Sequence, residues 1–154
     1  MSPRSNSSRP PVVVRNEIVI GAPAERVWDV LADVERWPTW WRACWWVRVE
    51  SSDVVGRVLS FRWKAHPVTL QSTVVASDRP YVFAISADGR GVHAERTFTL
   101  RPTMDGLRTV VVSDETQVGW LPWLGRAILA PRLRAVNQAM FEDLAQTARS
   151  RAQG

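Results

Sequence analysis

The sequence predicts an α+β fold in which seven antiparallel strands form one sheet and a long C-terminal helix lies against it. Short β-branched or alternating segments, separated by turn residues, recur between residues 44 and 117, as in an antiparallel sheet. Apolar residues at helical intervals precede these segments in residues 27–34 and follow them in residues 128–144. The 154 residues suit one domain, which we place at residues 12–150.

The N-terminal residues divide into a tail and a first strand. Residues 1–11 are rich in Ser, Pro and Arg and hold no apolar residue after Met1, so we expect a disordered tail. Residues 12–20 are mostly β-branched and lie between Pro11 and Gly21, which predicts the first strand.

Two short helices are predicted between the first and second strands. Pro23 and Glu25 suit the first turn of a helix. Asp33 is expected to cap a second helix, which Pro38 limits or restarts. The apolar residues that follow the helical repeat are Val27, Trp28, Leu31 and Val34. The stretch from Ala22 to Trp46 also holds six of the nine tryptophans.

Six further strands are predicted after these helices. Their expected ranges are residues 45–50, 57–65, 68–76, 81–87, 94–101 and 107–117. Within the second of them, Leu59, Phe61 and Trp63 share one face. Asp88-Gly89 and Asp105-Gly106 supply the residues that tight hairpin turns require.

The rest of the chain predicts a helical segment that ends near Arg149. Its apolar positions are Ile128, Leu129, Leu133, Val136, Met140 and Leu144. Pro131 is expected to begin or kink the main helix, so that residues 123–130 form a separate turn. The helix needs a partner surface, and the sheet is the only large one available.

Two segments resemble a known family. The segments IGAPAERVW (residues 20–28) and DVERWPTWW (residues 33–41) resemble the opening of the polyketide cyclase/dehydrase and lipid-transport group of the START-like, Bet v 1-like (SRPBCC) superfamily. Glu115-Thr116 and LAPRL (residues 129–133) are also similar to that group. The resemblance implies a helix-grip fold, in which a curved sheet wraps the long helix around a ligand cavity. Because members include cyclases, carriers of lipids and quinones, and proteins of no known activity, it indicates fold more than activity.

Composition excludes several classes of function. Cys44 is the only cysteine, so neither an intramolecular disulfide nor a thiolate metal cluster can form. The net charge of +5 is spread along the chain, with basic against acidic residues three to one in residues 1–21, ten to nine in residues 22–100 and seven to five in residues 101–154. We therefore expect no nucleic-acid partner. A secretory signal and a run of about 20 apolar residues are both absent from the sequence, which favours a cytoplasmic protein.

Large aromatic residues on alternating strands form either an ordinary core or the wall of an apolar pocket. Arg96 shares strand parity with Phe98 and therefore faces the same side. A buried arginine needs a partner, for which Glu115 is the nearest candidate and Asp114, of opposite parity, the alternative. The residues expected to contact a ligand are Trp28, Trp40, Phe61, Trp63, Phe83, Arg96, Phe98, Glu115, Val136 and Met140.

Recognised catalytic motifs and cofactor sites are missing from the sequence, so catalytic residues stay unassigned and no cofactor is expected. Residues 89–94 fit G-x-G-x-x-A by letter, but they lead into a strand and are interpreted as a hairpin turn. His66 and His93 are the only imidazoles, and His93 with Glu95 is interpreted as a solvated strand face rather than a metal site. Cys44 is interpreted as a small core residue.

The leading hypothesis is a binding module that encloses a hydrophobic small molecule of lipid, polyketide or isoprenoid type between sheet and C-terminal helix. One alternative is a polyketide cyclase or dehydratase in which Arg96, Glu115 or Tyr81 polarises a carbonyl or moves a proton. Another is an interaction module built on Trp37, Trp40, Trp41, Trp45 and Trp46. A solvated helix face is favoured over membrane contact for the group Trp120, Trp123, Arg126, Arg132 and Arg134. The sequence does not indicate the oligomeric state.

Overall fold

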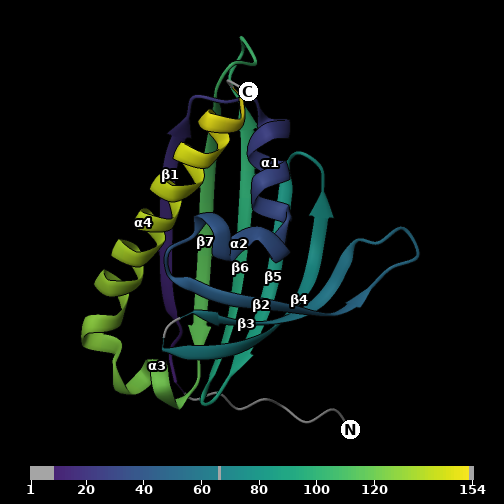
Figure 1. Cartoon of the computed structure of the whole chain (residues 1–154). Coiled ribbons are helices and arrows are strands. Elements are labelled where there is room, and N and C mark those ends of the chain that lie inside the picture. Colours follow the sequence, from purple (N-terminus) through teal and green to yellow (C-terminus); the bar gives the residue numbers. More distant parts are fainter. Residues whose placement is uncertain (1–8, 66, 153–154) are drawn as a thin grey trace, which may run out of the picture.

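A computed structural model describes residues 9–65 and 67–152 of the chain (Figure 1). Seven strands form one antiparallel sheet, as the sequence predicts, and their order in it is β1-β7-β6-β5-β4-β3-β2. Their bounds are Val12–Ile20 (β1), Cys44–Ser52 (β2), Val58–Ala65 (β3), Val68–Asp78 (β4), Val82–Gly89 (β5), Val92–Pro102 (β6) and Thr109–Val118 (β7). Each of the strands β2 to β6 pairs with the next strand along the chain, and β7 pairs with β1 on its other side.

The helices lie on one side of this sheet. They are α1 (Ala24–Ala32), a 3₁₀ turn at Val34–Arg36, α2 (Trp37–Trp40), α3 (Trp120–Leu124) and α4 (Arg126–Ala152). Helix α4 packs against β1 and α1, and the sheet curves around it (Figure 1). The described chain therefore has the helix-grip arrangement, with two short helices between β1 and β2.

Alternation of buried and exposed residues explains which face of each strand meets the helices. In β1, Val12, Val14 and Asn16 are buried, whereas Val13 and Arg15 between them are exposed. This two-residue period leaves one apolar face to cover, and α4 covers it.

An aromatic cluster anchors α2 in the core. The ring of Trp37 meets those of Trp41, Phe61 and Trp63 edge-on, at centroid distances of 5.2, 5.4 and 5.3 Å. Its indole N–H donates to the carbonyl of Leu31 at 2.9 Å, which joins α2 to the end of α1. This cluster fixes the entry into β2.

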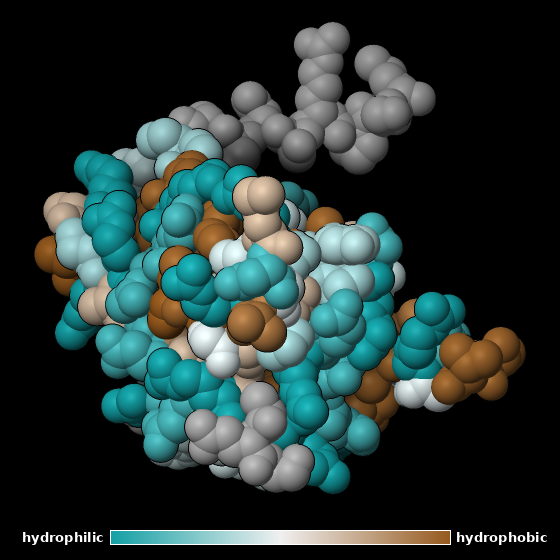
Figure 2. All heavy atoms as spheres, turned by 90° about the horizontal axis from the view of Figure 1, so that it is seen from above, coloured by the Kyte–Doolittle hydropathy of each residue, from teal (hydrophilic) through white to brown (hydrophobic). Residues whose placement is uncertain are grey.

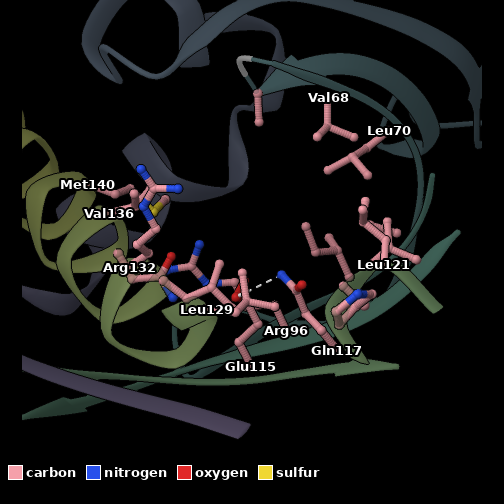
Figure 3. A pocket seen from close by; sticks show the side chains of 18 of the residues that line it. Val68, Leu70, Arg96, Glu115, Gln117, Leu121, Leu129, Arg132, Val136 and Met140 are labelled. Atoms are coloured by element: carbon pink, nitrogen blue, oxygen red, sulfur yellow. Dashed lines mark hydrogen bonds between the residues drawn. The ribbon is translucent and has the colours of Figure 1, made fainter. Parts of the chain in front are cut away.

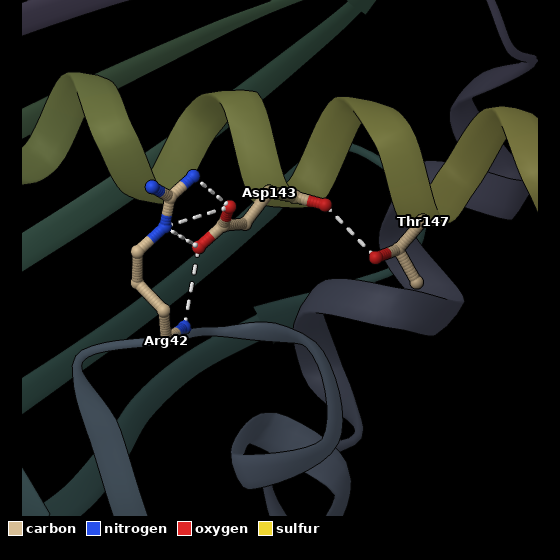
Figure 4. A network of polar contacts seen from close by, with 3 residues as sticks. All are labelled: Arg42, Asp143 and Thr147. Atoms are coloured by element: carbon tan, nitrogen blue, oxygen red, sulfur yellow. Dashed lines mark hydrogen bonds and ion pairs between the residues drawn. The ribbon is translucent and has the colours of Figure 1, made fainter.

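An ion pair fastens the turn before β2 to α4 (Figure 4). The Arg42 guanidinium binds both carboxylate oxygens of Asp143, with Nη2 to Oδ1 at 2.6 Å. The backbone N–H of Arg42 also donates to Asp143 Oδ2 at 3.2 Å. Arg42 lowers the pKa of Asp143 below its ordinary value, chiefly through this side-chain hydrogen bond.

The starts of two helices agree only in part with the predictions, since residues 126–130 belong to α4 and not to a separate turn. Helix α4 begins at Arg126 and contains Pro131, so the break before it lies at Gly125 instead. The N–H of Gly125 donates to the carbonyl of Leu121 at 3.3 Å and closes α3 there. Asp33 occupies the expected cap position without a capping hydrogen bond, and it pairs with Arg36 at 3.5 Å.

The hairpin between β2 and β3 projects from the body of the molecule (Figure 2). Val54 and Val55 at its tip are exposed, and so is Leu59, at 43%. Leu59 shares the face of Phe61 and Trp63 but lies beyond the core, because strand parity sets direction and not depth.

Two predictions from the sequence concern residues that lie partly or wholly outside the described part of the chain. The predicted tail covers residues 1–11, of which 1–8 lie outside the described residues, as does His66. In the part that the structure describes, no helix combines the length and the apolar character needed to cross a membrane.

Candidate functional site

A cavity of about 890 Å³ lies between the sheet and the N-terminal half of α4 (Figure 3). This volume falls within the range of about 300–1,000 Å³ that is typical of small-molecule sites. Strands β3 to β7 line one side, and α2, α3 and α4 complete the wall. The fold therefore encloses a space of ligand size where a filled core would otherwise lie.

Apolar side chains make up most of the wall. Figure 3 shows Val68 and Leu70 of β4 across the cavity from Leu129 and Val136 of α4. The indole rings of Trp41 and Trp63, whose centroids are 5.1 Å apart, line it beside α2. Such a surface favours an apolar ligand, since burying it removes apolar area from water.

The cavity opens to solvent along α3 and the first turns of α4. Ile128 and Val136 line it and are 59% and 46% exposed. Leu121 and Pro122 of α3 belong to the same rim. A ligand therefore has a route of entry beside α3.

The structure brings six of the ten predicted ligand contacts to this cavity. Those six are Trp63, Arg96, Phe98, Glu115, Val136 and Met140. The other four lie elsewhere, in the surrounding core: Trp28 meets Phe83 edge-on at 5.8 Å, Phe61 packs against Trp37, and Trp40 stacks on Trp41 at 6.4 Å. Contact with a ligand stays a prediction for all ten.

Arg96 of β6 is the buried cation of the site, with 7% of its surface exposed. It lies directly opposite Glu115 of β7, the register that the sequence analysis required. The two side chains do not meet as an ion pair; instead Arg96 Nε donates to Ser113 Oγ at 2.8 Å, and the guanidinium lies 4.5 Å from the centre of the Phe98 ring. Asp114, the alternative partner, points away and binds Arg15 at 3.2 Å.

Two electrostatic effects act on Arg96 in opposite directions. Burial lowers its pKa, and the charge of Glu115 raises it. An arginine nevertheless keeps its proton in proteins, so the site holds a cation with the Glu115 carboxylate beside it. Gln117 Nε2 donates to Glu115 Oε2 at 3.5 Å and completes this polar strip on the sheet (Figure 3).

Sequence reasoning missed three polar residues of the site, which are Ser113, Gln117 and Asn137. Ser113 has the parity of Glu115 in β7, and this signal was available in the alternation. Asn137 lies on the same helix face as Leu133 and Met140 and lines the cavity, with only 3% of its surface exposed. Helical periodicity identifies apolar positions, so it does not select an amide side chain that lies among them.

Other candidate chemistry lies outside the cavity. His93 binds Asp88 at 2.6 Å and lies 3.6 Å from Glu95, and these acidic neighbours raise its pKa, the Asp88 hydrogen bond most. Among the described residues, no group of three potential metal ligands is found. Burial raises the pKa of Cys44 to about 12, which makes this thiol a poor nucleophile. Strands β5 and β6 form a hairpin, as the sequence predicts, but the predicted turn pair Asp88-Gly89 is wrong: both residues lie in β5, and the turn is Arg90-Gly91, where Gly91 has the positive φ.

A family model described as "Polyketide cyclase / dehydrase and lipid transport" matches residues 11–149 of the chain. No curated protein sequence gives a significant match.

Several solved structures share the fold. A START superfamily protein from Mycobacterium smegmatis has a TM-score of 0.71 at 17% identity, covering 92% of this chain and 97% of that one. The Zhui aromatase/cyclase from Streptomyces sp. R1128 has a TM-score of 0.74 at 20% identity, covering 93% and 96%. A protein from Thermus thermophilus has a TM-score of 0.76 at 20% identity, covering 90% and 97%. At these identities the likeness shows the fold alone.

Proposed function

Because the chain belongs to the polyketide cyclase/dehydrase and lipid transport family, we propose that it binds a hydrophobic small molecule in the cavity between the sheet and α4. The observation that carries the proposal is an open cavity of about 890 Å³ with a mainly apolar wall. Water in such a space finds few hydrogen-bond partners, so an apolar ligand that displaces it gains free energy. Lipids, polyketides and isoprenoids have the required character.

A cyclase or dehydratase is the second candidate, and the Arg96–Glu115 pair in the cavity wall favours it. A cation beside a carboxylate is suited to polarising a carbonyl and moving a proton once a flexible chain is held in position. Tyr81 is not among the lining residues and is half-exposed, so this role falls to Arg96 and Glu115 alone. The Zhui protein is described as an aromatase/cyclase. Ligand binding is common to both candidates.

The tryptophan-based interaction module receives less support. Trp37 and Trp41 are buried in the core, at 1% and 4% exposure. Trp45 and Trp46 are exposed on β2, where Lys64 lies 5.1 Å from the first ring and Arg48 lies 5.9 Å from the second. The exposed pair is thus smaller than the cluster of five on which that hypothesis rests.

The test combines native mass spectrometry of the purified protein with binding of the neutral dye Nile red. We expect a co-purifying apolar compound, and a Kd for Nile red that rises at least about tenfold in Ala94→Phe, since this cavity-lining residue would then fill part of the space. Ala127→Phe is the matched control, because Ala127 is exposed on α4 and does not line the cavity. Equal dye binding by the two folded variants would contradict the proposal.

A further inference from the structure

We propose that this cavity selects a neutral ligand whose carbonyl oxygen accepts hydrogen bonds from Arg96 and Asn137, and that it disfavours free carboxylates. The inference rests on the proposed binding of an apolar molecule and specifies the polar group of that molecule. It follows from the hydrogen-bond donors and the charges in the cavity wall.

Two buried donors in the wall have no partner among the residues that the structure describes. Arg96 Nη2 and Asn137 Nδ2 are both inaccessible and make no hydrogen bond. Leaving a buried donor unpaired costs about 1–3 kcal/mol, so native proteins rarely keep such groups without a use for them. Two other buried polar atoms of the described residues lack a partner, the acceptor Asn16 Oδ1 and the donor Trp40 Nε1, but neither residue lines the cavity.

The two donors come from opposite sides of the same space. Arg96 projects from β6 in the sheet, and Asn137 projects from α4, which faces the sheet across the cavity. An acceptor held between helix and sheet, within hydrogen-bond distance of both groups, would satisfy both. A carbonyl oxygen, with two lone pairs, is such an acceptor.

The arginine is held in place before any ligand arrives. Its Nε–H is bound to Ser113 Oγ at 2.8 Å, and the guanidinium lies over the ring of Phe98. Because the guanidinium is planar, fixing Nε also fixes the direction of Nη2. Little conformational entropy is then lost when a ligand accepts from it.

Charge decides between a carbonyl and a carboxylate. Glu115 lies opposite Arg96 and lines the same cavity, so these two residues together carry no net charge. A carboxylate ligand would place a second negative charge beside Glu115, and the single buried cation, Arg96, would have to neutralise both charges. Arg132 also lines the cavity, but it is exposed at the rim, where water screens its charge. A neutral carbonyl gains the hydrogen bonds without that repulsion.

The ligand class is therefore an apolar body with a ketone, ester, enone or quinone oxygen. A hydroxyl group near that oxygen could in turn donate to Glu115, which accepts only from Gln117 at 3.5 Å among the side-chain hydrogen bonds of the described chain. Free fatty acids and other anions are expected to bind less well.

A matched series on one ring system tests the inference by displacement of Nile red at pH 7.5. The three compounds are 2-acetylnaphthalene, 2-ethylnaphthalene and 2-naphthoate, which present a ketone, a hydrocarbon and a carboxylate on similar bodies. For the parent chain we expect the ketone to bind at least about tenfold more tightly than the hydrocarbon, and the carboxylate to bind no more tightly than the hydrocarbon.

Variants assign the preference to the two donors. Asn137→Leu should reduce the ketone-to-hydrocarbon ratio to about threefold or less, and Arg96→Leu should abolish it, while 2-ethylnaphthalene keeps its affinity. Arg96→Leu leaves Glu115 without its cation, so Arg96→Leu/Glu115→Gln repeats the test with both charges removed. Arg101→Leu is the control, because Arg101 lies exposed on the same strand.

The outcomes separate the two proposals. Equal affinity of the parent for ketone and hydrocarbon, or tightest binding of the naphthoate, overturns the inference and leaves the proposed function intact. A preference for the ketone that survives in both Asn137→Leu and the double variant also overturns it. If none of the compounds, nor Nile red, binds to the parent, the proposed function itself fails.

Discussion

The two halves of α4 carry the same kind of apolar pattern and meet different surroundings. In residues 137–152, Phe141 and Leu144 are completely buried against the rest of the core. In residues 126–136, Ile128 and Val136 face the cavity and remain about half exposed. One helix thus contributes folding stability chiefly from its C-terminal half and most of its cavity-lining residues from its N-terminal half, with Asn137 and Met140 lining the cavity at the junction.

The largest expected effect comes from deleting a core side chain in the buried half. Phe141→Ala should lower the free energy of unfolding by about 3–5 kcal/mol, because it removes a fully buried ring that packs 6.4 Å from the ring of Phe98. Ile128→Ala, in the exposed half, should change it by less than about 0.5 kcal/mol. Urea denaturation measures both variants.

The variants Ile128→Ala and Phe141→Ala also test whether the two halves of α4 have different roles. Ile128→Ala should weaken Nile red binding although the protein is as stable as the parent. Comparable losses of stability in Ile128→Ala and Phe141→Ala would contradict the contrast between the two halves.

A smaller effect is expected at the ion pair that fastens the buried half. Asp143→Asn should cost about 1 kcal/mol, since Arg42 is largely exposed and solvent screens part of the interaction. Arg42 lowers the pKa of Asp143 in the folded state, so the carboxylate contributes its full stability above the unfolded value of about 3.9. That contribution is lost as the pH falls through the lower folded pKa.

The measurement is the difference in unfolding free energy between parent and Asp143→Asn as a function of pH. The difference should be complete at about pH 6 and should shrink below about pH 4. Glu142→Gln is the control, because Glu142 is the exposed neighbour on the same helix. If the difference in unfolding free energy instead grew as the pH fell, the expected coupling between protonation of Asp143 and stability would have the wrong sign.

The contrast also explains how far the sequence could predict this molecule. Alternation and turn dipeptides predicted all seven strands, because several strands, β1, β3 and β6 among them, alternate more buried with more exposed residues. Pro131 led the prediction to misplace the start of α4, because the helix continues through this proline and the break before it lies at Gly125. These predictions concern where strands and helices begin and end, and they do not say how deeply a residue is buried.

Predicting the residues of the candidate site requires knowing how deeply each side chain is buried. Phe61 and Trp63 lie two residues apart on one face of β3, yet Phe61 packs within the core and Trp63 lines the cavity. Ile128 and Leu144 follow the same helical repeat with opposite burial. Periodicity reports which way a side chain points, whereas the curvature of the sheet decides whether it meets protein or open space. For the same reason, sequence reasoning could identify Arg96 but not Asn137 as part of the polar wall.

The smallest expected effect distinguishes the rim of the cavity from its interior. Arg132 lines the cavity in the exposed half of α4, so its charge is screened by water, whereas Arg96 is buried. Arg132→Gln should therefore change the affinity for 2-acetylnaphthalene by less than about twofold. Displacement of Nile red at low salt and at about 0.5 M salt measures it, and Arg96→Leu provides the comparison. A loss in Arg132→Gln as large as that in Arg96→Leu would mean that the rim, and not the buried wall, binds the ligand's polar group.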